Sequence, residues 1–293
     1  MTEPQLRFVN CLDATGLHRM AYWEWAGPGA EAPVLVCVHG LSRQGRDFDA
    51  LARVMSARYR VICPDVAGRG RSDWLRQPAA YQIPTYVADM VTLLARLDVA
   101  QVDWVGTSMG GLIGMGLAAL PRPDGAPCPI RRLVLNDVGP SISFDALLRI
   151  GSYLGKAPGF ATVEAGAAYL RGISASFGPH TDEEWLALSR PMLKPAGAGW
   201  ALHYDPAIAA GFALLTPELA AAGEAALWAA YERLACPTLL LRGAESDLLG
   251  ADTARRMAER GPQARLVEFA GVGHAPTLVH EDQIAAVKGF LSP

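Results

Sequence analysis

A serine flanked by two glycines, at the junction of an apolar run and a run of small residues, is the feature that most constrains the fold of this chain. Residues 106–110 read Gly-Thr-Ser-Met-Gly and fit the pattern Gly-x-Ser-x-Gly. The apolar residues 102–105 precede it, and a helix-compatible run from 109 to 120 follows. Between a strand and a helix, such a turn holds the serine hydroxyl clear of the backbone, near the positive end of the helix. The sequence therefore predicts that Ser108 is an exposed nucleophile.

Such a pentapeptide also arises by chance in a chain with 30 glycines, as a turn with a passive serine. The surrounding sequence favours the first interpretation, because predicted strands and helices alternate on both sides of the turn. Strands are predicted at residues 33–38, 59–63, 102–105, 132–136, 237–242 and 265–269, after an opening hairpin of 6–9 and 20–25. Helices are predicted at residues 47–57, 85–97, 109–120, 251–260 and 282–291. Apolar strands separated by helices indicate an α/β protein with a mostly parallel sheet covered on both faces.

The alternation stops between residues 139 and 235. This segment is rich in alanine, leucine and aromatic residues, is broken by glycine and proline, and contains no convincing strand. We interpret it as a group of helices inserted between two strands. The predicted organisation is a core of residues 1–138 and 236–293, with a helical insertion of residues 139–235.

In a parallel sheet covered by helices, the chemistry takes place at the carboxyl ends of the strands. Six polar residues follow directly after predicted strands and are therefore expected along one edge of the sheet. They are His39, Asp65, Ser108, Asp137, Asp247 and His274.

A serine hydroxyl is almost fully protonated at neutral pH, so the nucleophile needs a base within hydrogen-bond reach. His274 is the predicted base, because it lies in the glycine-rich loop 271–276 directly after a strand. His39 also follows a strand and is its rival. The remaining histidines belong to an early turn, to the insertion or to the start of the last helix.

The base in turn needs a carboxylate that orients its ring and stabilises the imidazolium. Asp247 is the predicted acid, because it follows the strand 237–242, and the next strand, 265–269, leads to His274. Asp137, after the strand next to Ser108, is the alternative. Glu245 lies two residues before Asp247 and is expected to point elsewhere.

An anionic tetrahedral intermediate needs hydrogen-bond donors that face its oxygen. The backbone N–H of Met109, directly after the nucleophile, is one predicted donor. The N–H of Leu41, in the loop after the strand 33–38, is the second. Gly40 permits this loop to turn, and His39 is expected to brace it from behind.

Together these motifs resemble the α/β-hydrolase fold superfamily, in its serine esterase and lactonase-like branch. The resemblance extends from His39-Gly40 through Gly68-Arg-Gly-Arg-Ser-Asp73 to Gly273-His274, and the order Ser, Asp, His matches that family. It implies that residues 139–235 form a helical cap over the site and that the Asp and Arg residues of 65–73 pin loops. The serine at 108 separates the chain from the branches that use aspartate at this turn.

The resemblance implies a serine hydrolase that needs no cofactor or metal and cleaves a small, partly apolar carboxylic ester or lactone through an acyl-enzyme. The alternatives are a carbon–carbon bond hydrolase of ring-cleavage products, a cofactor-free perhydrolase, and a ligand receptor on a hydrolase scaffold. Cap aromatic residues and two residues of the loop after the strand 33–38 are candidate substrate contacts. They are His39, Ser42, Trp185, Trp200, Tyr204 and Phe212, with His203 and Trp228 as further candidates in the cap.

The composition excludes several other classes. The net charge is −3 and no basic patch dominates, so neither nucleic acid nor a membrane surface is an expected partner. The cysteines are odd in number and separated in sequence, which indicates reduced thiols and not a disulfide framework; they are Cys11, Cys37, Cys63, Cys128 and Cys236. Residues 1–10 lack the apolar stretch of a signal peptide. We expect a cytoplasmic monomer or small homo-oligomer.

Overall fold

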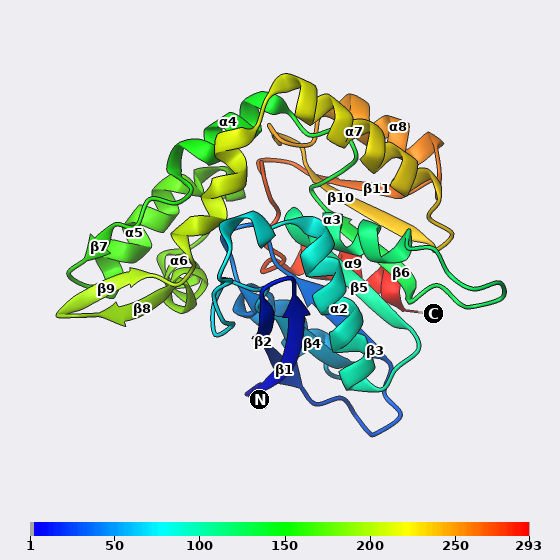
Figure 1. The fold of residues 1–293 in the computed structure, drawn as a ribbon, viewed down its shortest axis with the longest axis horizontal. Helices are drawn as coiled ribbons and strands as arrows, with labels where there is room; N and C mark the ends of the chain where they lie inside the picture. Colours follow the sequence, from blue (N-terminus) through cyan, green and yellow to red (C-terminus); the bar gives the residue numbers. More distant parts are fainter. Residues whose placement is uncertain (1–2, 293) are drawn as a thin grey trace.

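The computed structural model describes residues 3–292. Its centre is an eight-stranded sheet with the strand order β1-β2-β4-β3-β5-β6-β10-β11 (Figure 1). The strands are β1 Gln5–Asp13, β2 Gly16–Trp25, β3 Val34–Val38, β4 Arg60–Pro64, β5 Val102–Thr107, β6 Ile130–Asn136, β10 Thr238–Gly243 and β11 Arg265–Phe269. The first two form an antiparallel hairpin, and the six others run parallel to one another. The predicted α/β class with a mostly parallel sheet is confirmed.

Helices cover both faces of this sheet, because its central strands present apolar side chains on both faces. Side chains of a strand alternate between its two faces, and in β10 Leu240 belongs to one apolar cluster while Leu239 and Leu241 belong to another. The helices around the sheet are α1 Asp49–Met55, α2 Ile83–Leu97, α3 Met109–Ala118, α8 Ala251–Glu259 and α9 Glu281–Leu291. The helices α2, α3 and α8 pack into the first cluster, and α1 and α9 into the second. The central strands β3 and β10 are therefore buried along their whole length.

A long segment is inserted between β6 and β10. Its helices and strands are α4 Phe144–Tyr153, β7 Gly159–Phe160, α5 Val163–Ile173, α6 Asp182–Ser189, β8 Leu193–Ala196, β9 Gly199–Leu202 and α7 Pro217–Glu232. Short 3-10 helices complete the chain: η1 Gly45–Phe48, η2 Pro78–Ala80, η3 Ala175–Phe177, η4 Arg190–Met192 and η5 Pro206–Leu214. In Figure 1 the strands β7–β9 lie away from the main sheet, whereas α7 lies beside α8.

The prediction that this insertion contains no strand is wrong. The strands β7, β9 and β8 form a small antiparallel sheet in that order. β8 and β9 are four residues each and carry alanine, glycine and proline, so no alternation of apolar and polar residues marks them. Gly197, with a φ of 56°, makes the tight turn between them.

The division into a core of 1–138 and 236–293 and an insertion of 139–235 stays a prediction. Met1, Thr2 and Pro293, which these ranges and the N-terminal signal prediction include, lie outside the described residues. Within residues 3–292, no single helix combines the length and the apolar composition needed to cross a membrane. The segments Pro206–Leu214 and Pro217–Glu232, bent by 101° at their junction, pass that test of length and composition only as a pair.

Candidate active site

Ser108 lies at a sharp turn between β5 and α3. Its backbone has a φ of 51° and a ψ of −116°, a conformation that costs energy for a residue with a side chain. The two glycines are required by contact: a Cβ at Gly106 would lie 2.3 Å from the carbonyl of Gly110, and a Cβ at Gly110 would lie 2.0 Å from the carbonyl oxygen of Val38. The pattern is therefore a packing requirement of a turn that lifts Ser108 to the edge of the sheet.

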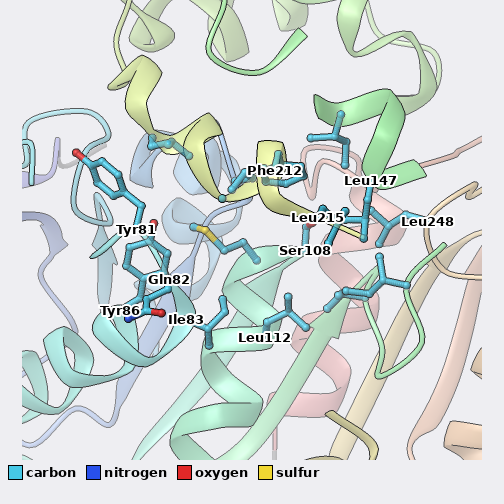
Figure 2. A pocket seen from close by; sticks show the side chains of 17 residues that line it. Tyr81, Gln82, Ile83, Tyr86, Ser108, Leu112, Leu147, Phe212, Leu215 and Leu248 are labelled. Carbon is cyan, nitrogen blue, oxygen red and sulfur yellow. The ribbon is translucent and has the colours of Figure 1, made fainter. Parts of the chain in front are cut away.

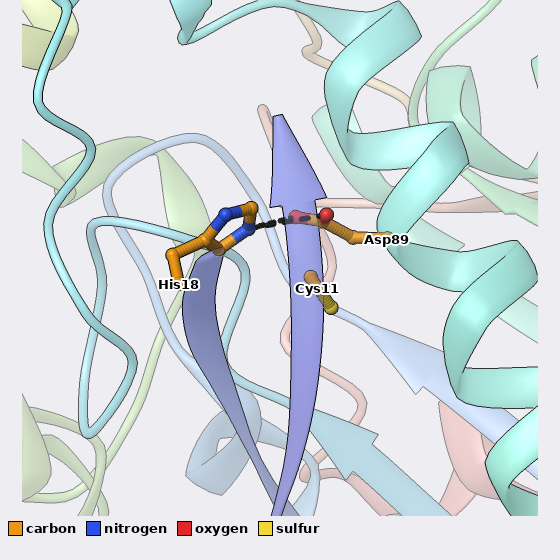
Figure 3. A group of neighbouring side chains, drawn as sticks. All are labelled: Cys11, His18 and Asp89. Carbon is orange, nitrogen blue, oxygen red and sulfur yellow. Dashed lines mark hydrogen bonds and ion pairs between the residues drawn. The ribbon is translucent and has the colours of Figure 1, made fainter. Parts of the chain in front are cut away.

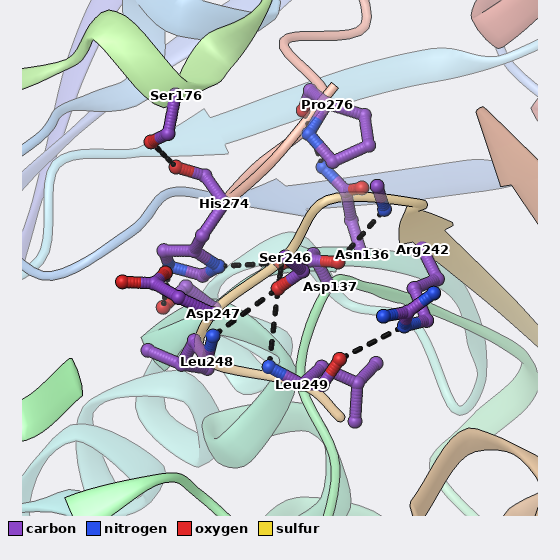
Figure 4. A network of polar contacts seen from close by, with 12 residues as sticks. Asn136, Asp137, Ser176, Arg242, Ser246, Asp247, Leu248, Leu249, His274 and Pro276 are labelled. Carbon is purple, nitrogen blue, oxygen red and sulfur yellow. Dashed lines mark hydrogen bonds and ion pairs between the residues drawn. The ribbon is translucent and has the colours of Figure 1, made fainter. Parts of the chain in front are cut away.

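His274 connects this serine to the buried carboxylate of Asp137, and Figure 4 shows His274 and Asp137. Its Nε2 lies 3.0 Å from Oγ of Ser108, and its Nδ1 lies 2.7 Å from Oδ2 of Asp137. His274 comes from the loop after β11, and Asp137 directly follows β6. The structure thus places three of the six predicted strand-end residues in one continuous hydrogen-bonded chain.

Asp137 is held on both sides of its carboxylate. Oδ1 accepts a hydrogen bond of 2.9 Å from the N–H of Gly243, and Oδ2 accepts one of 2.6 Å from Oγ of Ser246. The side chain is fully buried. Hydrogen bonds of this kind fix the orientation of the carboxylate.

The prediction that Asp247 orients His274 is wrong. The side chain of Asp247 is 46% exposed and forms a two-pronged ion pair with Arg149, at 2.7 and 3.0 Å. The cause is the turn after β10: the Oγ of Ser246 accepts from the N–H groups of Leu248 and Leu249, which fixes Ser246 inward and leaves Asp247 outward. The alternative considered from the sequence, Asp137, occupies the position.

The two predicted oxyanion donors lie beside Ser108. Met109 is the first residue of α3, so its N–H has no acceptor within that helix. The loop of Leu41 passes close to the turn, because a Cβ at Gly40 would lie 3.7 Å from Cβ of Ser108. The buried Arg69 donates from Nε to the carbonyl of Leu41, at 2.8 Å, and thereby fixes this loop. Their role as oxyanion donors stays a prediction.

His39 lies behind the same loop and not in the site. It is fully buried, its Nδ1 donates to the carbonyl of Gly40 at 2.7 Å, and its Nε2 accepts from the N–H of Val66 at 2.9 Å. Burial lowers the pKa of His39 to about 3, so the ring is neutral, as these two hydrogen bonds require. His39 braces the loop as expected, and its prediction as a substrate contact is wrong.

Asp65 likewise holds loops together. Its buried carboxylate accepts from the N–H groups of Gly45 and Arg71, at 2.8 and 2.9 Å, and burial raises its pKa to about 6. It makes no contact with Ser108 or His274 among the hydrogen bonds of residues 3–292. This agrees with the expectation that the Asp and Arg residues of 65–73 pin loops.

Two cavities meet at Ser108. The larger, of about 240 Å³, is bounded by residues of α2, α3, α4 and η5 and of the loops beside them, and these residues are almost all apolar (Figure 2). They are Leu41, Tyr81, Gln82, Ile83, Tyr86, Ser108, Met109, Leu112, Val138, Ile142, Leu147, Ile150, Ile208, Gly211, Phe212, Leu215 and Leu248. The smaller, of about 70 Å³, includes His274 and several polar side chains, among them Ser42, Arg149 and Ser176.

These cavities include two of the predicted substrate contacts and omit the others. Phe212 lines the larger cavity and Ser42 the smaller one. Four aromatic residues of the insertion, with His203, line neither; they are Trp185, Trp200, Tyr204 and Trp228. Trp185, for example, stacks on Phe177 with ring centroids 6.2 Å apart, inside the insertion. Sequence reasoning missed Leu147 and Ile150, which share the inward side of α4, because their spacing is equally typical of core packing.

A second polar group lies between the β1–β2 hairpin and α2 (Figure 3). Cys11, His18 and Asp89 are buried and have the mutual spacing of metal ligands. The Nε2 of His18 lies 3.1 Å from both carboxylate oxygens of Asp89, and this hydrogen bond raises the pKa of His18. Burial and the Asp89 carboxylate raise the pKa of the Cys11 thiol well above its usual range, which favours the protonated thiol. The group ties the hairpin to α2.

The fold and the site are those of a hydrolase, and the chain belongs to the alpha/beta hydrolase family. The family model, described as "Alpha/beta hydrolase family", matches residues 35–287, and the predicted family is confirmed. A curated relative, the 3-hydroxybutyrate-oligomer hydrolase of Cupriavidus necator, is 55% identical over 99% of this chain and 98% of its own. The putative carbamate hydrolase RutD of Pseudomonas syringae is 27% identical over 90% of this chain and 95% of its own. The crystal structure of an alpha/beta hydrolase from Novosphingobium aromaticivorans matches with a TM-score of 0.85 and 35% identity, covering 99% of both chains.

Proposed function

We propose that this protein hydrolyses esters of short hydroxy acids, such as oligomers of 3-hydroxybutyrate, through an acyl-enzyme on Ser108. The observation that carries the proposal is the hydrogen-bonded chain Ser108–His274–Asp137 at the mouth of an apolar cavity. The relative named 3-hydroxybutyrate-oligomer hydrolase, 55% identical over nearly the whole of both chains, supports this substrate class.

The first half of the reaction forms the acyl-enzyme. Oγ of Ser108 attacks the ester carbonyl while Nε2 of His274 takes its proton, over a starting separation of 3.0 Å. The N–H groups of Met109 and Leu41 hold the oxygen of the tetrahedral intermediate. When the intermediate collapses, the C–O bond of the ester breaks, and the leaving alkoxide receives the proton from His274.

The second half returns the enzyme to its starting state. Water gives a proton to His274 and attacks the acyl carbonyl, and the second tetrahedral intermediate expels Ser108, which recovers its proton. Asp137 accepts from Nδ1 of His274, so it keeps Nε2 free to act as a base and stabilises the imidazolium. The products are one carboxylic acid and one alcohol.

A fluorophosphonate probe tests the nucleophile, and the free 3-hydroxybutyrate dimer tests the substrate class. We expect one equivalent of label on Ser108 and hydrolysis of the dimer to two molecules of 3-hydroxybutyrate. Ser108→Ala is expected to abolish both. Unchanged turnover of the dimer by this variant would refute the mechanism, and labelled enzyme that leaves the dimer intact would refute the substrate class.

A further inference from the structure

The two cavities that meet at Ser108 differ in chemistry, and this difference orients an ester. The larger cavity presents Leu112, Leu147, Ile150 and similar side chains, and His274 is not among its lining residues. The smaller cavity, the more polar of the two, contains His274 with serines and arginines, beside apolar residues such as Ile150 and Phe177. A substrate bound with its carbonyl carbon at Ser108 therefore extends one of its two parts into each cavity.

The position of His274 decides which part enters which cavity. The alkoxide that leaves must take its proton from Nε2 of His274, so the alcohol part of the ester has to lie on the His274 side. That side is the polar cavity. The acyl part then lies in the apolar cavity, whose volume of about 240 Å³ is at the small end for ligand sites and suits a short chain.

Arg149 is the cation available in the polar cavity. The other arginine there, Arg43, is nearly buried, and its donors go to Asp47, at 2.7 Å each, and to the carbonyl of Leu188. The side chain of Arg149 is 39% exposed, and Asp247 accepts from its Nε and Nη2. Among the hydrogen bonds of residues 3–292, none comes from Nη1 of Arg149, although the Tyr153 hydroxyl also interacts with the guanidinium. A guanidinium has five N–H donors, so the edge that carries Nη1 can take a second, bidentate acceptor.

An outer groove of about 470 Å³ continues from this point. Four residues line both the polar cavity and the groove: Arg149, Tyr153, Ile173 and Ser176. Asp247 lines the groove but not the polar cavity. Arg149 therefore stands between His274 and the outside. Its ion pair with Asp247 holds the guanidinium at this place.

We propose that Arg149 binds a carboxylate carried by the alcohol part of the ester, so that the enzyme cleaves hydroxy-acid oligomers from their carboxyl end. This inference rests on the proposed function. In a 3-hydroxy acid ester the carboxylate is two carbons from the carbon that carries the leaving oxygen, and the small volume of the polar cavity keeps it near Arg149. Each cycle then releases one free hydroxy acid with its carboxylate on Arg149. Asp247 acts as a positioning residue for that guanidinium.

The test compares two substrates that differ only at this end: the free-acid dimer of 3-hydroxybutyrate and the same dimer with its carboxylate converted to an N-methyl amide. We expect the wild-type enzyme to prefer the free acid. In Arg149→Gln, kcat/KM for the free acid falls about 10- to 100-fold, chiefly through KM, because a charge-assisted hydrogen bond is lost. For the amide, kcat/KM changes by less than about 2-fold, because the amide has no carboxylate that could bind to the charge of Arg149. Arg149→Lys restores part of the preference.

Arg255→Gln is the matched control, because Arg255 also pairs with an aspartate on the surface, on α8. It is expected to leave both substrates unchanged. Solvent-exposed ion pairs contribute little to folding, so both variants should remain folded. An equal loss on the acid and the amide in Arg149→Gln, or no loss on either, overturns the inference. If the wild-type enzyme hydrolyses the free-acid dimer in that case and Ser108→Ala does not, the proposed function stands; if the wild-type enzyme leaves the dimer intact, both fail.

Discussion

Nδ1 of His274 lies 2.7 Å from Oδ2 of Asp137, while the carboxylate of Asp247 is bonded to Arg149. Asp137 follows β6, the strand that lies between β5, which carries Ser108, and β10. The carboxylate therefore reaches His274 from the strand next to the nucleophile. The loop after β10 contributes Ser246 to the same chain, and its hydroxyl donates to Asp137.

Exchange of the two aspartates for asparagine separates their roles. Asp137→Asn is expected to lower kcat by about 10⁴, because the amide favours the wrong tautomer of His274 and cannot stabilise the imidazolium. Asp247→Asn is expected to keep kcat on p-nitrophenyl butyrate within about 3-fold, since the variant alters the exposed ion pair with Arg149 and the alcohol part of this ester carries no carboxylate for Arg149 to bind. Steady-state kinetics measure both. A large loss in Asp247→Asn with little loss in Asp137→Asn would reverse the assignment.

Gly110, two residues after the nucleophile, is expected to be essential for folding. Gly110→Ala places a Cβ 2.0 Å from the carbonyl oxygen of Val38, so helix or strand has to move. We expect a loss of at least about 3 kcal/mol in the free energy of unfolding, measured by urea denaturation. The control is Gly223→Ala in α7, where a Cβ has open space. That variant is expected to gain about 0.5–1 kcal/mol, and equal losses in the two would contradict the packing argument.

The pair of His18 and Asp89 is expected to make stability depend on pH. The hydrogen bond to Asp89 raises the pKa of His18 above its usual 6.5, so protonation of His18 favours the folded state. This contribution is fully present below pH 6.5 and is lost as the pH rises through the higher pKa of the folded state. Asp89→Asn is expected to lose about 3–5 kcal/mol at pH 6, because it breaks a buried ion pair. Thermal unfolding at pH 6 and pH 9 measures the effect, and a loss that is larger at pH 9 would contradict the sign.

The size of the apolar cavity is expected to set the acyl chain length. Phe212→Ala removes a ring that lines the larger cavity, and it should raise kcat/KM for p-nitrophenyl octanoate relative to the butyrate by about 10-fold. Leu214→Ala is the matched control, because Leu214 lies in the same 3-10 helix and is 73% exposed. A chain-length panel shows the result. The same shift in both variants would mean that the cavity is not the acyl site.

The turn at Ser108 and the loop of His274 were predictable because their determinants are local. Glycines that no side chain can replace, and an apolar run before them, are readable in the sequence. The covered sheet was predictable for a similar reason, since strands buried on both faces, such as β3 and β10, consist mostly of apolar residues.

The choice between Asp137 and Asp247 depends on two facts that no local pattern records. One is the lateral strand order, in which β6 separates β5 from β10. The other is the turn at Ser246, whose hydroxyl accepts from two following N–H groups and directs Asp247 outward. The lining of the cavities was missed because apolar spacing on α4 is the same for core and cavity residues. The cytoplasmic location and the monomeric or small oligomeric state stay predictions.

The central claim is that Ser108 carries an acyl group during turnover. The most direct measurement is rapid acid quenching of the enzyme during hydrolysis of p-nitrophenyl butyrate, followed by intact-mass and peptide mass spectrometry. The account predicts one butyryl group per chain, located on Ser108, that accumulates in step with a burst of p-nitrophenol and is absent from Ser108→Ala. A butyryl group on another residue, or full turnover in Ser108→Ala, would contradict it.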